Sequence, residues 1–208
     1  MKTVIVTGGI GSGKSTLCSY LQSEGVWVYD SDSRTKLLYD SDPHLLDSVE
    51  TALGRSFRTC VGTLDRRSLA EVVFNDSDAL RRLEMIVHPK VLEDFLKWKS
   101  TREVEGEAWC GLGDVPFVVM ESAIALEKPE FLAIADKVVE VIAPEAVRLE
   151  RAMLRDSSSC ERVKERMLSQ RLSSEGHKKA CVDAVIENTG DINDLKKAAD
   201  LCFAALWS

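Results

Sequence analysis

Residues 1–16 of this 208-residue chain read MKTVIVTGGIGSGKST. The apolar, β-branched run at residues 4–6 predicts a buried strand, and the residues after Lys14 suit a helix. Between the two, residues 8–15 fit G-x-x-x-x-G-K-[ST], the pattern of a phosphate-binding loop. Because the match lies between a predicted strand and a predicted helix, it indicates a nucleoside triphosphate site rather than an ordinary glycine-rich turn.

The residue types of this loop suit a phosphate chain. Glycines let backbone N–H groups approach the charge closely, and the N-terminus of the following helix adds a positive dipole. Lys14 can reach the β- and γ-phosphates, and Ser15 can place its hydroxyl on a Mg²⁺ ion that is also held by waters. The loop residues expected to bind the nucleotide are Gly9, Gly11, Ser12, Gly13, Lys14, Ser15 and Thr16.

Composition excludes several classes of protein. The net charge of −7 and the pI of about 5.1 argue against non-specific nucleic-acid binding, which needs a basic surface. No stretch approaches the roughly 20 apolar residues that a membrane helix requires, and the first residues do not resemble a signal peptide. The six cysteines are scattered without a C-x-x-C pair, so we interpret them as buried or idle thiols of a cytoplasmic protein.

Further strands are predicted at residues 26–29, 115–120, 137–143 and 183–188, with helices between them and a last helix at 193–206. This alternation predicts an α/β fold with a five-stranded parallel sheet. Ligands of such sheets bind at the carboxyl ends of the strands. The acidic residues that follow strands there are Asp30, Asp32 and Glu121.

Asp32 has two possible chemical roles and one structural alternative. Its carboxylate can accept a proton from a hydroxyl that attacks the γ-phosphate, or it can hold Mg²⁺ through water. Alternatively, one of Asp30 and Asp32 merely caps the helix expected at residues 33–39.

Residues 41–100 read as a helical insert that could cover an acceptor substrate, and residues 101–114 read as a polar loop. His88 and Pro89 interrupt the apolar pattern, so we expect a helix to break there. Arg66 could equally be a solvated charge and His88 part of a turn. Two arginine-bearing helices at about residues 147–175 have the pattern of a lid over the phosphates, although such helix faces are often simply solvent-exposed.

Taken together, these segments resemble dephospho-coenzyme A kinases along nearly the whole chain. The resemblance rests on an ordered set of motifs: the complete phosphate loop, a D-S-D element at 30–32, G-T-L-D-R-R at 62–67, H-P at 88–89, the lid with Gln170, and I-E-N-T-G at 186–190. The family usually has D-V-P-L-L-x-E after its third strand. Here E-S-A-I-A-L-E stands at 121–127, without the proline.

The resemblance implies a P-loop kinase-like, three-layer fold in one domain over residues 1–208. Its core would be about 1–40, 115–146 and 180–208, with an acceptor-binding insert at about 41–100 and a lid at about 147–175. It also implies that ATP and Mg²⁺ phosphorylate the ribose 3′-hydroxyl of dephospho-coenzyme A, the last step of coenzyme A synthesis. The roles implied by the resemblance are catalysis by Lys14, Asp32 and Arg151; ATP contacts from Arg155, Asn188 and Gly190; and acceptor contacts from Asp32, Arg66, His88 and Glu121.

Two other functions share parts of this pattern. Another small-molecule or nucleotide kinase would keep the loop and the lid, and would differ in the acceptor insert. A GTP-controlled switch would carry N-K-x-D and D-x-x-G motifs. Residues 188–191 supply the Asn and Asp of the first motif but lack its Lys, and no D-x-x-G follows a predicted strand.

Overall fold

The computed structural model describes residues 1–105, 115–174 and 181–207. The chain divides into two compact units. The sheet unit comprises Met1–Asp30 and Gly106–Ser208, and the helical unit comprises Ser31–Glu105. Because the boundary at Asp30 falls where a strand ends and a helix begins, the helical unit is an insertion, in chain order, between two strands of the sheet.

The sheet unit is built on five parallel strands in the order β2-β3-β1-β4-β5, which confirms the predicted α/β fold with a parallel sheet. The second strand begins two residues later than predicted, because the Val26 N–H donates to the Leu21 carbonyl (2.9 Å) at the end of the first helix. The strands are β1 (Lys2–Thr7), β2 (Val28–Asp30), β3 (Phe117–Glu121), β4 (Lys137–Ile142) and β5 (Ala184–Glu187).

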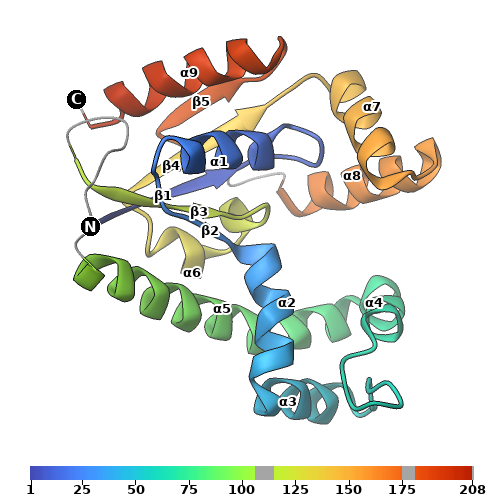
Figure 1. Ribbon diagram of the computed structural model, residues 1–208. Coiled ribbons are helices and arrows are strands. Elements are labelled where there is room, and N and C mark those ends of the chain that lie inside the picture. The colour runs from blue at the N-terminus through green and yellow to red at the C-terminus, as the bar shows by residue number, and fades with distance from the viewer. Residues whose placement is uncertain (106–114, 175–180, 208) are drawn as a thin grey trace. The chain divides into compact units, whose positions relative to one another are not determined.

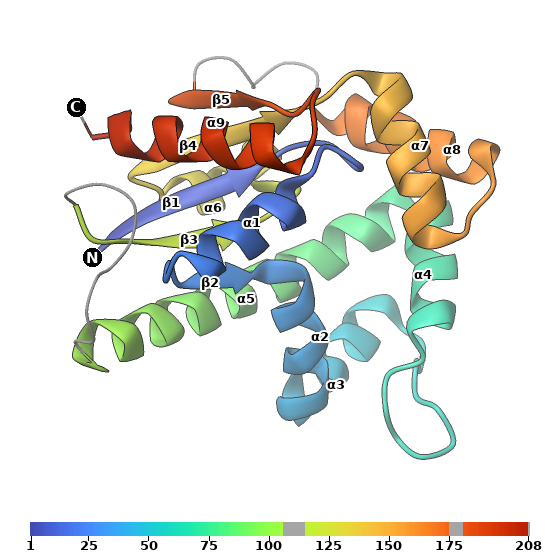
Figure 2. The same ribbon diagram turned by 45° about the horizontal axis from the view of Figure 1, so that its top comes forward.

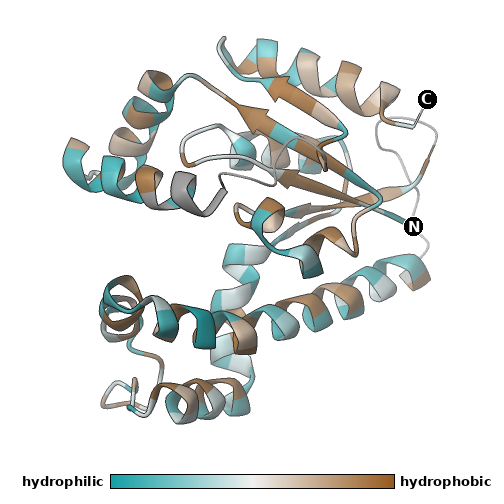
Figure 3. Cartoon of the chain, turned by 180° about the vertical axis from the view of Figure 1, so that it is seen from behind, coloured by the Kyte–Doolittle hydropathy of each residue, from teal (hydrophilic) through white to brown (hydrophobic). Residues whose placement is uncertain are grey.

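Helices cover both faces of the sheet. α1 (Lys14–Ser23) and α9 (Ile192–Ala205) lie on one face (Figures 1 and 2). The sheet strands are mostly hydrophobic (Figure 3), and Phe117 of β3 stacks on Phe203 of α9 with ring centroids 5.4 Å apart. The other face packs against η1 (Ala125–Glu127) and α6 (Pro129–Leu132). The fold therefore has the three layers expected from the sequence.

The segment predicted to form a lid is a helical hairpin of α7 (Glu145–Asp156) and α8 (Cys160–Ser174), which follows β4 (Figure 1). We keep the name lid for this hairpin. Ala152 of α7 and Val163 of α8 are fully buried. At the turn, the Asp156 carboxylate accepts hydrogen bonds from Arg155 Nε (2.7 Å) and Arg166 Nη1 (2.6 Å). These two arginines join the end of α7 to α8 and hold the pKa of Asp156 well below its usual range.

The helical unit contains α2 (Ser31–Ser41), α3 (Pro43–Leu53), α4 (Arg66–Asn75) and α5 (Ser77–Glu105). Aspartates cap three of these helices. The side chain of Asp42 accepts the His44 N–H, that of Asp65 accepts the N–H groups of Arg67 and Ser68, and that of Asp76 accepts those of Asp78 and Ala79. A bidentate ion pair joins α2 to α5: Arg34 donates to Asp94 through Nε (2.8 Å) and Nη2 (2.7 Å).

Two predictions about this region were wrong. α5 runs through Pro89 as one helix of 29 residues, whereas a break was expected at His88 and Pro89. Proline removes one backbone hydrogen bond, but Val87, Val91 and Phe95 form one buried stripe at four-residue spacing across the site. α5 also continues to Glu105, so residues 101–105 are helical; the remainder of the expected loop, 106–114, lies outside the described residues. Of the helices in the described ranges, none could span a membrane.

We predict that Phe203→Ala lowers the free energy of unfolding by about 3–5 kcal/mol, because it leaves a cavity against Phe117. Urea unfolding followed by circular dichroism measures the loss. Leu201→Ala on the same helix is the control, since Leu201 is 75% exposed and its truncation should change stability by less than about 0.5 kcal/mol. Equal losses in the two variants would contradict the packing described here.

Candidate active site

The phosphate loop connects β1 to α1 and is enclosed by its neighbours. Gly11 and Gly13 adopt positive φ angles of 75° and 101°. A Cβ on Gly11 would lie 2.1 Å from the Arg148 carbonyl oxygen, and one on Gly13 would lie 2.1 Å from Asn188 Nδ2. Only glycine fits both the backbone angle and the space. The path that lets backbone N–H groups turn inward is therefore imposed by α7 and by the residue after β5.

Asn188 supports the loop from below. Its Nδ2 donates to the Ser12 carbonyl (2.8 Å), and the side chain is almost fully buried. The Asn188 carbonyl in turn accepts a hydrogen bond from Arg151 Nη1 (3.3 Å). Gly190 packs against Asp194, the third residue of α9 and a member of its capping box, because a Cβ there would lie 2.2 Å from Asp194 Oδ2. In this structure Asn188 holds the backbone of the loop. The ATP contact expected from the sequence stays a prediction.

A hydroxyl–carboxylate pair lies beside the loop, between Ser15 of α1 and Glu121 of β3. Ser15 Oγ donates to Glu121 Oε1 (2.7 Å). Glu121 is the last residue of β3 and pairs in register with Val6 of β1 and Asp30 of β2. A hydroxyl and carboxylates at adjacent strand ends are hard oxygen donors of the kind that Mg²⁺ prefers, with waters completing its coordination. This donor set fits the magnesium ion expected at Ser15.

Cys18 lies behind Glu121 and was interpreted from sequence only as a buried or idle thiol. Its side chain is 3% exposed and lies close enough to the Glu121 carboxylate to feel its charge. Burial, and then the charge of Glu121, raise the pKa of the thiol well above its usual value. The thiol therefore stays protonated at neutral pH, while Glu121 accepts its hydrogen bond from Ser15.

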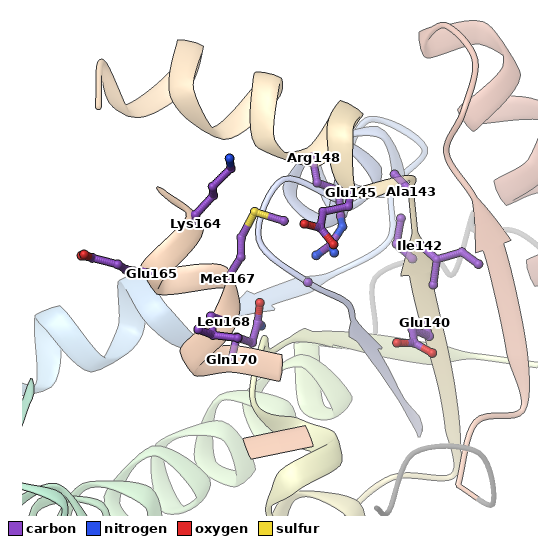
Figure 4. A pocket seen from close by; sticks show the side chains of 12 residues that line it. Glu140, Ile142, Ala143, Glu145, Arg148, Lys164, Glu165, Met167, Leu168 and Gln170 are labelled. Atoms are coloured by element: carbon purple, nitrogen blue, oxygen red, sulfur yellow. The ribbon is translucent and has the colours of Figure 1, made fainter. Parts of the chain in front are cut away.

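A pocket of about 640 Å³ opens beside the loop, between the end of β4 and the lid (Figure 4). Arg148 and Glu145 project into it from α7, and Met167 and Gln170 come from α8. A Cβ on Gly9 would lie 2.3 Å from Arg148 Nη1, so this guanidinium is in contact with the loop. Two of the expected lid contacts are engaged elsewhere in this structure: Arg155 with Asp156, and Arg151 with Asn188.

The helical unit has a pocket of its own, with a volume of about 300 Å³ and mainly apolar walls. It brings together Arg66 and His88, which lie 22 positions apart in the sequence and were both predicted to bind the acceptor. Burial raises the pKa of Tyr39 in its wall to about 12, so this phenol is a neutral hydrogen-bonding group. Asp32 stands in the first turn of α2, three residues before Thr35 of the same wall. Residues three and four apart share one face of a helix.

Comparison with known proteins identifies the family. A sequence model described as dephospho-CoA kinase matches residues 2–194. The chain belongs to the dephospho-CoA kinase family. The dephospho-CoA kinase of Porphyromonas gingivalis is 41% identical over 170 residues, covering 82% of this chain and 78% of that protein. The one from Salinibacter ruber is 36% identical over 205 residues and 98% of both chains. The solved structure of the Campylobacter jejuni dephospho-CoA kinase is 26% identical, covers 96% of this chain and 94% of its own, and superimposes with a TM-score of 0.63.

Membership of the dephospho-CoA kinase family accounts for the motifs, but three contact residues were not expected from them. Arg148 is one of several arginines in the two helices predicted at about residues 147–175, Gln170 belongs to the lid motif, and Cys18 is one of six scattered cysteines. None of these patterns predicts the contacts described above. For Cys18 a signal was present: it lies one helical turn after Ser15 in α1, and therefore on the same helix face. The contacts of Arg148 and Gln170 with the loop join residues more than 130 positions apart, which local patterns do not report.

We predict that Asn188→Ala weakens ATP binding about tenfold, because the Ser12 carbonyl loses its buried partner at a cost of about 1–2 kcal/mol. Calorimetric titration with a non-hydrolysable ATP analogue measures the change. Asn193→Ala is the matched control, since Asn193 is exposed in the first turn of α9. Unchanged affinity in Asn188→Ala would show that the loop keeps its shape without this hydrogen bond.

Proposed function

We propose that this chain transfers the γ-phosphoryl group of ATP to the ribose 3′-hydroxyl of dephospho-coenzyme A, giving coenzyme A and ADP. The observation that carries the proposal is the family match over residues 2–194, which extends through the phosphate loop, the helical unit and the lid. The enclosed phosphate loop supports the donor half of the reaction, and the pocket of the helical unit supports the acceptor half.

ATP would be bound by the backbone of the phosphate loop, with Lys14 at its β- and γ-phosphates. The contributing loop residues are Gly9, Gly11, Ser12, Gly13, Lys14, Ser15 and Thr16. Because these N–H groups are fixed before the substrate binds, they stabilise transferred charge without reorganising. Arg151 and Arg155 would add positive charge from the lid, and release of Arg155 from Asp156 would accompany that step. The segment of Asn188 and Gly190 would border the nucleotide.

Magnesium would be held by Ser15, through its hydroxyl, and by waters that face Glu121. When bound, the ion neutralises charge on the β- and γ-phosphate oxygens. The fit of this site rests on the hydroxyl–carboxylate pair at 2.7 Å.

The acceptor would bind in the helical unit, in the pocket that contains Arg66 and His88. The Arg66 guanidinium donates to the Lys36 carbonyl (3.2 Å) and lies 3.7 Å from Asp40, so its position is set by α2. Asp32, on the same helix, would accept the proton of the attacking hydroxyl. Glu121 would complete the acceptor contacts from the sheet unit.

The cytoplasm is the proposed compartment. The five described cysteines are free thiols, which suits a reducing environment. The substrate would be a small molecule rather than a nucleic acid, in keeping with the net charge of −7.

The proposed reaction predicts strict acceptor dependence. With Mg-ATP, the chain should release one ADP for each coenzyme A formed, and it should turn over slowly with AMP, adenosine, shikimate or no acceptor. A coupled ADP assay, with coenzyme A quantified by chromatography, measures both products. Faster turnover with another acceptor would retain the phosphate site and overturn the assignment of the pocket around Arg66 and His88.

The base assignment predicts that Asp32→Asn lowers kcat by about 10²–10⁴-fold while leaving the KM for ATP nearly unchanged. Lys14→Ala should raise the activation free energy of turnover by about 3 kcal/mol or more, because stabilisation of the γ-phosphate is lost. Asp78→Asn is the matched control, because this carboxylate is 73% exposed at the start of α5. A kcat for Asp32→Asn within about twofold of the unsubstituted chain would exclude Asp32 as the base.

A further inference from the structure

One side chain of the lid, Gln170, contacts two segments that border the phosphate site. Its Oε1 accepts the backbone N–H of Ile10 (2.8 Å), and its Nε2 donates to the Ala123 carbonyl (3.4 Å). The three residues come from α8, the phosphate loop and the segment after β3, and are 160 and 47 positions apart in sequence. A carboxamide suits this place because it carries an acceptor and a donor on one rigid group.

The first contact is at the tip of the phosphate loop. Ile10 lies between Gly9 and Gly11, and the loop turns there through a hydrogen bond from Ser12 N to the Gly9 carbonyl (3.0 Å). The Ile10 N–H is thus directed to the lid. A Cβ on Gly9 would lie 3.7 Å from Gln170 Oε1, so the loop and α8 are in van der Waals contact here. The shape of the loop tip therefore depends on where α8 stands.

The second contact reaches the segment that carries Glu121. Ala123 is two residues beyond Glu121, and between them the buried Ser122 donates its N–H to the Val6 carbonyl (3.0 Å). The path of this short segment determines how the Glu121 carboxylate faces Ser15. Through Ala123, the same carboxamide that holds the loop tip also holds the backbone next to the proposed magnesium site.

We propose that Gln170 is a positioning residue that couples the lid to the phosphate loop and to the Glu121 segment, so that the γ-phosphoryl group goes to the acceptor and not to water. The inference rests on the proposed function. A lid excludes water only when it stands in a fixed place over the transferring group. Gln170 gives α8 that place, because both of its hydrogen bonds form only when the loop tip and the Glu121 segment are in register with the lid.

The test uses the full chain with Gln170→Ala and Gln170→Glu. Alanine removes both contacts. Glutamate keeps an acceptor for Ile10, loses the donor to Ala123 and adds negative charge beside the phosphates. Gln22→Ala is the matched control, because Gln22 is an exposed glutamine on α1. ADP and coenzyme A are quantified in the same reactions with Mg-ATP and dephospho-coenzyme A, and ADP is also measured without acceptor.

We expect Gln170→Ala to lower coenzyme A formation about tenfold, as for the loss of two ordinary hydrogen bonds. The ratio of ADP to coenzyme A should rise above one, while the KM for ATP changes less than kcat. Gln170→Glu should be at least as impaired, and Gln22→Ala should match the unsubstituted chain. A ratio that stays at one in both Gln170 variants would overturn the coupling role, whether kcat falls or not.

Amide hydrogen exchange without any substrate gives a second, independent readout. Loss of the Gln170 contact should speed exchange at the Ile10 amide, with no change at the Val4 amide of the central strand. If the unsubstituted chain forms no coenzyme A, the proposed function fails. Faster exchange at Ile10 in Gln170→Ala would still support the link between lid and loop, and unchanged exchange there would overturn it.

Discussion

The active site depends on holding a glycine-rich backbone in a shape that it would not keep by itself. Glycines at the loop supply freedom to turn, and that same freedom costs conformational entropy when the loop is ordered. Residues outside the loop supply this order. Asn188 donates to the Ser12 carbonyl, Arg148 contacts Gly9 and Gly11, and Gln170 accepts the Ile10 N–H. N–H groups that are already oriented can stabilise phosphoryl transfer without reorganisation, so these contacts would serve the reaction that we propose.

Two of those three supports come from the α7–α8 hairpin, so the segment that we propose as a lid is also a structural neighbour of the loop. Its arginines differ in their attachments: Arg151 reaches the Asn188 carbonyl, whereas Arg155 is held at the hairpin turn by Asp156. The Asp156 carboxylate offers Arg155 a partner when no phosphate is near. In the proposed function, a bound nucleotide would take the place of Asp156 as the partner of that guanidinium, so that Arg155 would keep an anionic partner in both states.

The sequence predicted the parts of this arrangement that local chemistry determines. The phosphate-loop motif located β1, the loop and α1, and strand alternation led to the five-stranded parallel sheet. Local patterns failed where packing decided, as at Pro89, where a buried stripe on both sides of the proline keeps α5 continuous. The contact of Gln170 with Ile10 was not predictable, because it depends on how distant elements meet. For Cys18 the sequence carried a signal, since it lies one helical turn after Ser15.

The segment after β3 shows how one constraint can replace another. The acidic ends of the family pattern remain at residues 121 and 127, but its proline does not, and a proline would restrict the backbone by its ring. Here the path is fixed by hydrogen bonds from Ser122 N to the Val6 carbonyl and from Glu127 N to the Ile124 carbonyl. Ala125 and Leu126 are buried against the sheet, and Gln170 bonds to Ala123. Because backbone bonds, burial and the lid all act on seven residues, Glu121 keeps its place beside Ser15 without the proline.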